Sequence, residues 1–94
     1  MSKSFLQMDQ YNLFTFVSAS HALKAERVLK DEGMDFIMIP TLREISASCG
    51  LSVKVAPDDF NSCLQVLKQN RVQMNGIYYV QKDRGKNRIQ KIEI

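Results

Sequence analysis

The sequence predicts a single α+β domain, and three observations support that prediction. The chain has 94 residues, which is the length of one ordinary domain. Hydrophobic residues make up 45% of it and charged residues 24%, the balance expected of a globular protein rather than a disordered one. Short β-branched and aromatic runs alternate with stretches of helical periodicity, in the order strand, helix, strand, and then again in the same order.

The first half of the chain is predicted to form a strand, a helix and a second strand. Residues 11–17 are a β-branched and aromatic run of strand length. Apolar residues then recur at helical spacing, with Ser18 or Ser20 placed to cap the helix and Gly33 placed to end it. Residues 35–40 predict the second strand, which a proline stops.

The second half repeats this order and adds a strand. Residues 51–55 alternate apolar and polar, like a strand with one covered face. A helix is expected from Pro57, and its buried stripe at i, i+3, i+4 and i+7 consists of Phe60, Cys63, Leu64 and Leu67. Residues 76–82 predict a fourth strand, residues 83–87 a turn, and residues 88–94 an alternating fifth strand.

The two halves of the chain share a short sequence repeat. The tripeptide Val-Leu-Lys occurs at residues 28–30 and again at 66–68, and the same offset places residues 13–17 on residues 51–55. The order βαββαβ predicts a ferredoxin-like sandwich, in which two helices cover one face of an antiparallel sheet, with a C-terminal strand added. A parallel α/β sheet is the alternative, and the amphipathic strands disfavour it because they expect one open face.

The same pattern predicts how the chain divides. Residues 1–10 are expected to form a flexible N-terminal arm, residues 11–82 the ferredoxin-like domain, and residues 83–94 a turn and an extra strand of that domain. No stretch has the apolar length of a signal peptide or of a membrane span, so we expect no membrane association and a cytoplasmic location. The open face of the sheet, or one of its edges, would allow a homodimer.

The net charge of +3 is too small to indicate a nucleic-acid partner. RNA-binding domains of this fold type display stacking aromatic residues on their central strands, whereas the third strand here reads LSVKV. We therefore expect no nucleic acid to bind. The basic residues near the C-terminus are better explained as a solvated edge that discourages strand pairing; they are Lys82, Arg84, Lys86, Arg88 and Lys91.

The two cysteines predict thiols rather than a disulfide or a metal centre. A chain without an export signal meets a reducing cytosol, where disulfides are rare. Structural zinc requires four ligands, and Cys49, Cys63 and His21 are one too few, so we expect neither a metal nor another cofactor. Cys63 lies in the apolar stripe of the second helix and is expected to pack there as a small hydrophobic residue.

Cys49 differs because small residues surround it in a loop between two strands. Ser46, Ser48 and Gly50 allow backbone amides to approach a thiolate or a ligand closely. Arg43, the loop amides and a helix N-terminus are the groups that would stabilise the anion of this thiol.

In the ferredoxin-like topology this loop meets the end of the first strand and the start of the first helix, so Cys49 would face Ser18, Ser20 and His21. The residues alone leave a second interpretation open, with Cys49 buried at the start of a strand. Arg43 would then be a solvated charge, and His21 an exposed residue at the start of a helix.

The chain from residue 13 to residue 79 resembles a small bacterial family of selenium/sulfur carrier-like proteins. The resemblance rests on LFTF followed by HALKAERVLK, on IPTLREISASCGLSVKV and on GIYYV, of which the middle segment is the most specific. It implies that Cys49 carries sulfur or selenium as a persulfide or selenosulfide, with Arg43, Ser46, Ser48 and Gly50 as its loop. It also implies a carrier rather than a stand-alone enzyme, with sulfur donor and acceptor proteins as partners.

A non-catalytic regulatory or small-ligand-binding module is the alternative function. In that case the SASCG segment would bind an anion through its backbone amides, as loop nests do. The two hypotheses differ at Cys49, which a binding module could replace by serine without loss.

Overall fold

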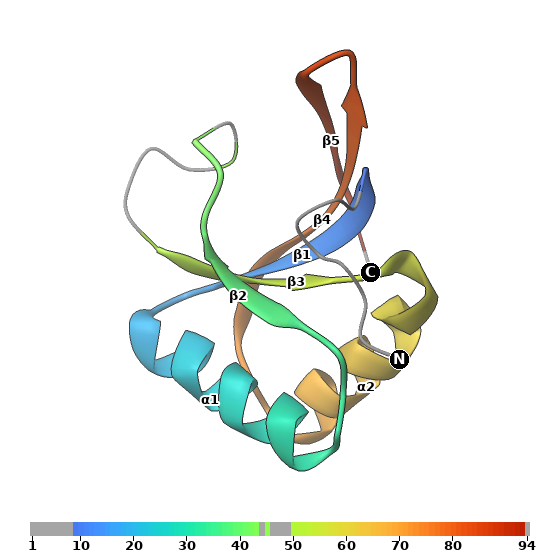
Figure 1. Ribbon diagram of the computed structural model, residues 1–94. Coiled ribbons are helices and arrows are strands. Elements are labelled where there is room, and N and C mark those ends of the chain that lie inside the picture. Colours follow the sequence, from blue (N-terminus) through green and yellow to red (C-terminus); the bar gives the residue numbers. More distant parts are fainter. Residues whose placement is uncertain (1–8, 44, 46–49, 94) are drawn as a thin grey trace.

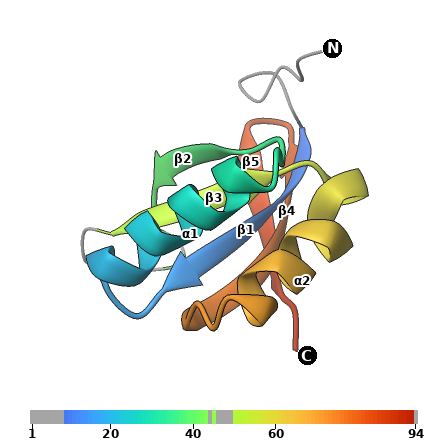
Figure 2. The same ribbon diagram turned by 90° about the horizontal axis from the view of Figure 1, so that it is seen from below.

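The computed structural model describes residues 9–43, 45 and 50–93, which form a five-stranded antiparallel sheet with two helices packed on one face (Figure 1, Figure 2). In chain order the elements are β1 (Gln10–Phe16), α1 (Ala19–Asp31), β2 (Ile37–Pro40), β3 (Leu51–Val55), the 3₁₀ turn η2 (Pro57–Asp59), α2 (Phe60–Gln69), β4 (Met74–Asp83) and β5 (Lys86–Lys91). The predicted α+β class, the antiparallel sheet and the two helices are thereby confirmed. Neither helix in this part of the chain is long and apolar enough to cross a membrane.

The helix ends follow their local chemistry. Ser18 is the residue that caps α1, because its Oγ accepts a hydrogen bond from the backbone N–H of His21 at 3.4 Å, whereas Ser20 lies inside the helix. Beyond the other end of α1, Gly33 takes the left-handed conformation with φ of 70°. The turn that begins at Pro57 is a 3₁₀ turn, and the α-helix proper starts three residues later, at Phe60.

The strands lie in the order β2-β3-β1-β4-β5, and every pairing among them is antiparallel, which excludes the parallel alternative for the described chain. β1 is the central strand. The β4–β5 turn consists of Arg84 and Gly85, whose φ angles of 52° and 81° are those of a tight type I′ hairpin. Because this turn has only two residues, β5 begins at Lys86, two residues before the predicted start.

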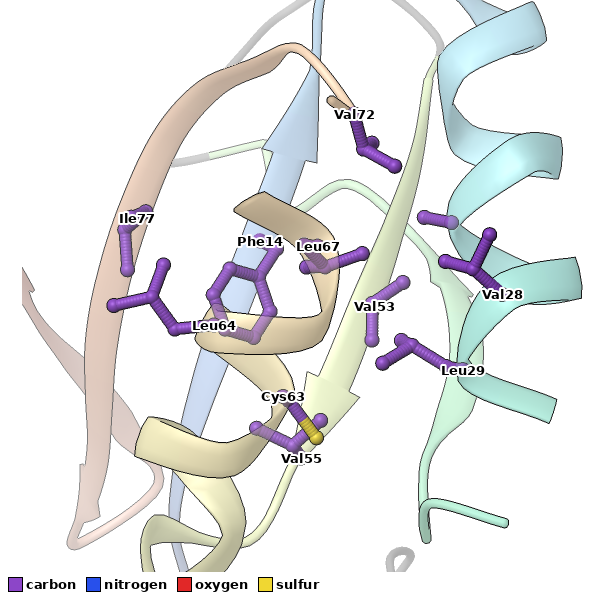
Figure 3. Close-up of a cluster of buried hydrophobic side chains, with 11 residues drawn as sticks. Phe14, Val28, Leu29, Val53, Val55, Cys63, Leu64, Leu67, Val72 and Ile77 are labelled. Carbon is purple, nitrogen blue, oxygen red and sulfur yellow. The ribbon is translucent and has the colours of Figure 1, made fainter. Parts of the chain in front are cut away.

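The main core fills the space between the sheet and the helices. Figure 3 shows Phe14 of β1 and Val53 and Val55 of β3 facing side chains from α1 and α2. Cys63 points from α2 into this core and is fully buried, at 0% exposure, so its prediction as a packing residue is confirmed. The ring of Phe14 also stacks on that of Phe60, with 5.6 Å between the centroids.

The sheet face opposite the helices carries a second, smaller core. Tyr11, Leu13 and Val80 are buried there. The chain that follows β2 and the β4–β5 hairpin both rise on this side (Figure 1), and their apolar side chains cover the face. Lys54 lies on the same face with its Nζ 4.1 Å from the centre of the Tyr11 ring. Burial, and to a lesser extent the charge of Lys82, lowers the pKa of Lys54.

Candidate functional site

A cleft of about 540 Å³ opens at one end of the sheet, where four segments meet. These segments are the end of β1 with the start of α1, the chain that follows β2, the start of β3, and the start of β4. The described residues that line the cleft are Thr15, Phe16, Val17, Ser18, Ala19, Thr41, Ile45, Gly50, Leu51, Asn75 and Tyr78. The sequence predicts that the end of the first strand, the start of the first helix and the connection between the second and third strands lie together. The described residues of these segments do line one cleft.

Two hydroxyl groups in the cleft wall are used by the fold itself. Thr15 Oγ1 donates a hydrogen bond to the carbonyl oxygen of Gly76 at 3.2 Å, across the β1–β4 pair. Thr41 Oγ1 and Ser52 Oγ lie 2.7 Å apart and share a hydrogen bond. These hydrogen bonds therefore hold the two threonine side chains in place in the cleft wall.

Gly76 makes room for Tyr78 on this wall. The two residues lie on the same face of β4, and a Cβ built on Gly76 would come within 2.7 Å of the Tyr78 hydroxyl oxygen. Only a residue without a side chain lets the phenol lie over the strand in this way. Neither the Tyr78 hydroxyl nor the Asn75 amide group has a hydrogen-bond partner within the described part of the chain, so both are available to a ligand in the cleft.

Gly50 closes the junction between β2 and β3. Its carbonyl oxygen accepts a hydrogen bond from the Thr41 N–H at 2.9 Å, and a Cβ at this position would lie 3.3 Å from Thr41 Oγ1. A side chain at this position would therefore crowd the Thr41 hydroxyl, whereas the backbone of Gly50 is not left-handed. It contributes main chain, and no side chain, to the cleft.

The remaining predicted site residues are placed as follows. Ser18 and Gly50 both line the cleft. His21 is half-buried, and its Nδ1 accepts a hydrogen bond from the backbone N–H of Gln73 at 3.2 Å, which ties α1 to the segment before β4. Arg43 lies in an exposed turn and is not among the described lining residues. Ser46, Ser48 and Cys49 lie outside the described residues.

Sequence reasoning missed four polar residues of the cleft, which are Thr15, Thr41, Asn75 and Tyr78. Threonine, asparagine and tyrosine at single strand positions have no spacing that distinguishes a site from an ordinary sheet. The one usable signal was Gly76 two residues before Tyr78, because glycine inside a strand often marks a close approach by another group.

The electrostatic character of the cleft follows from its lining. None of the described lining residues carries a charge at neutral pH. The N-terminus of α1 contributes Ser18 and Ala19 to the wall, and no acidic side chain in its first turn offsets the partial positive charge of the helix end. Within the part of the chain that the structure describes, no three histidine, cysteine, aspartate or glutamate side chains gather as a metal site would require.

Comparison with known proteins gives the chain a family. The model of a family described as "Putative Se/S carrier protein-like" matches residues 11–79, a span that contains every described residue of the cleft. No curated protein and no solved structure matched the chain. Since the match covers well over half of the sequence, the chain belongs to this Se/S carrier protein-like family.

Proposed function

We propose that this protein carries sulfur or selenium on Cys49, as a persulfide or a selenosulfide. The family description supports the nature of the cargo. The strand order β4-β1-β3-β2, with β5 added beside β4, supports a ferredoxin-like arrangement, in which the β2–β3 connection reaches the start of α1. In this proposal Arg43, Ser46, Ser48 and Gly50 form the loop around the thiol.

The observation that carries the proposal is the position of the residues on either side of the loop. Ile45 and Gly50 both line the cleft, and they bracket residues 46–49 in the sequence. Cys49 immediately precedes Gly50 in the sequence, and adjacent Cα atoms are about 3.8 Å apart. The proposed carrier residue is therefore bonded directly to a residue of the cleft wall. Cys63 is fully enclosed in the core, where a donor or acceptor could not reach its sulfur.

The loading step is an exchange between a thiolate and a persulfide. The Cys49 thiolate attacks the outer sulfur of a donor R–S–SH, a new S–S bond forms, and the donor S–S bond breaks. The products are the Cys49 persulfide and the donor thiolate R–S⁻, which takes up a proton from water. Unloading repeats the step with an acceptor thiolate as the attacking group, and neither direction needs a cofactor or an external oxidant.

Mass spectrometry of the loaded protein tests this assignment. The protein, prepared without reductant, is incubated with a low-molecular-weight persulfide, and the mass of the intact chain and of its peptides is measured. We expect one added sulfur atom on the peptide that contains Cys49, in the wild-type chain and in Cys63→Ala, and none in Cys49→Ser. Sulfur added equally to Cys49→Ser would refute the assignment and favour the ligand-binding alternative.

A further inference from the structure

The positive charge of this protein is concentrated on the β4–β5 hairpin. Residues 82–91 contain five basic residues and one acidic residue, a net charge of +4, whereas the whole chain has a net charge of +3. The rest of the sequence, residues 1–81 and 92–94, therefore sums to −1. The hairpin extends beyond the other strands (Figure 1), and its basic side chains are all exposed: Lys82, Arg84, Lys86, Arg88 and Lys91. This hairpin is thus the part of the protein that attracts negatively charged groups.

The outer edge of β5 presents backbone hydrogen-bonding groups. β5 is the last strand in the order of the described sheet, and it pairs with β4 alone. The N–H of Ile92 donates a hydrogen bond to the carbonyl oxygen of Ile77 at 2.8 Å, across this pair. In an antiparallel ladder the direction of these groups alternates along the strand, so the N–H and C=O groups of Ile89 and Lys91 point away from β4. Groups in this position are those with which an added strand pairs.

The opposite edge of the sheet, β2, is less suited to an added strand. β2 has four residues, against six in β5. The N–H of Thr41 donates a hydrogen bond to the carbonyl oxygen of Gly50, so the same alternation directs the main chain of Met38 and Pro40 outward. Pro40 has no N–H to donate. Of the two edges, β5 is therefore the one that can pair with a further strand along its length.

The side chains of β5 indicate what kind of strand fits beside it. Lys86 and Arg88 lie on the face where the helices pack, and Ile89 lies on the other face, beside the smaller core. Neighbouring strands place their side chains next to one another face by face, and unlike charges stabilise such pairs. An added strand with acidic residues on the first face and apolar residues on the second therefore matches β5. The β5 strand of a second copy would bring like charges together instead.

A hollow of about 300 Å³ adjoins this edge. Its lining consists of Tyr79, Gln81, Arg88, Ile89 and Gln90. The Arg88 guanidinium and the two glutamine amides supply N–H donors, and hydrogen bonds from a guanidinium to a carboxylate are among the stronger ones in proteins. A carboxylate side chain of an added strand would find its hydrogen-bond donors here.

We propose that the outer edge of β5 binds an acidic, extended segment of a partner protein, which joins the sheet as a further strand. A nucleic acid could contact the same cations, but it has no backbone that pairs with a strand edge, so the outward groups of Ile89 and Lys91 favour a peptide. β5 lies outside residues 11–79, the span that the family model matches. The proposed surface is also independent of the chemistry at Cys49.

Hydrogen exchange measured by NMR tests whether a strand is added. The probes are an eight-residue peptide of alternating glutamate and valine, acetylated and amidated at its ends, the same peptide with glutamine for glutamate, and an oligonucleotide of eight uridines. We expect the acidic peptide to slow exchange of the Ile89 and Lys91 N–H groups and to leave that of Met38 on β2 unchanged. The glutamine peptide should bind about tenfold more weakly.

Variants separate the charge from the strand pairing. Arg88→Glu should weaken binding of the acidic peptide about fivefold, whereas Lys68→Glu, on the exposed side of α2, should leave it unchanged. Lys91→Gln and Lys91→Pro both remove a cation, but only the proline also removes an outward N–H, so it should weaken binding several-fold further. Proline is tolerated where an edge N–H faces solvent, and circular dichroism checks that each variant is folded.

Three results would overturn the proposal. Binding of the acidic peptide without slower exchange at Ile89 and Lys91 would exclude an added strand. Tighter binding of the oligonucleotide than of the acidic peptide would show a nucleic-acid surface. Protection of these two N–H groups that grows with protein concentration, without any peptide, would show that a second copy occupies the edge. Because Cys49 takes no part in these measurements, failure here would leave sulfur loading untouched, and failure of sulfur loading would leave this surface in place.

Discussion

Cys63 shows how much the surroundings of a thiol decide its role. Its side chain is fully buried between α2 and the sheet. Cys63→Ala should lower the free energy of unfolding by about 1 kcal/mol, because a small buried group is removed and the site collapses only in part. Denaturant unfolding measures the loss, and sulfur loading should be unaffected. Rapid labelling of Cys63 in the folded chain by a bulky thiol reagent would contradict the packing role.

Arg43 is the residue through which the reactivity of Cys49 is best tested. If the guanidinium group stabilises the thiolate, the pKa of Cys49 lies below the ordinary cysteine value of about 8.5, and Arg43→Ala raises it. The rate of alkylation of Cys49 against pH gives this pKa directly, in a Cys63→Ala background. Arg88→Ala, which removes an exposed charge on β5, is the matched control and should leave the midpoint unchanged. An identical midpoint with and without Arg43 would remove this residue from the site.

Lys54, which lies on the sheet face opposite the helices, makes the stability of the protein depend on pH. Its folded-state pKa is lowered from the ordinary 10.5 by burial first and by Lys82 second. Between the lowered pKa and 10.5 the unfolded chain therefore binds more protons than the folded chain, so stability rises with pH in that window. Below the window, the cost of the buried charge is fully present.

Lys54→Met removes this dependence. The difference in unfolding free energy, wild type minus variant, should rise as the pH approaches 10.5 from below, when both proteins are unfolded by urea at a series of pH values. A difference that stays flat or falls over that range would contradict the sign derived from burial.

At the scale of elements, β4 positions the cleft through the pair Gly76 and Tyr78. Gly76→Ala brings a methyl group into the space of the Tyr78 ring and should destabilise the protein by roughly 1 to 3 kcal/mol, as overpacking does. In a Tyr78→Val background the same change should cost little, because the ring that it meets is gone. A double-mutant cycle by chemical denaturation measures this coupling. Equal costs in both backgrounds would show that the ring does not depend on the glycine.

Much of the element pattern could be predicted because local chemistry decides it. The alternation LSVKV predicted β3 at residues 51–55, and the structure has it there. The residues at which strands and helices begin were less predictable, because backbone geometry sets them. The left-handed pair Arg84 and Gly85 makes the hairpin turn two residues long, and nothing in residues 83–87 shows which two form it. The 3₁₀ turn before α2 is a similar case, because Pro57 suits the first turn of either helix type.

At the scale of the whole molecule, the fold brings together segments that are far apart in the sequence. Ser18, Gly50 and Tyr78 line one cleft because β1 lies between β3 and β4 at the centre of the sheet. The predicted topology alone was enough to expect Ser18 and Gly50 near each other. It could not supply Asn75 or Tyr78, because their roles depend on side-chain direction and on the space left over Gly76. For His21, which the sequence places opposite Cys49, the structure adds a hydrogen bond from the Gln73 backbone that no sequence pattern indicates.

The central claim is that sulfur passes through Cys49, and a single-turnover transfer assay tests it most directly. Protein loaded with isotopically labelled sulfane sulfur is freed of donor and mixed with an acceptor thiol, and the label on the acceptor is counted. We predict transfer of one sulfur atom per chain by the wild type and by Cys63→Ala, and none by Cys49→Ser, with all three proteins folded. Transfer by Cys49→Ser at the wild-type level, or none by the loaded wild type, would contradict the account.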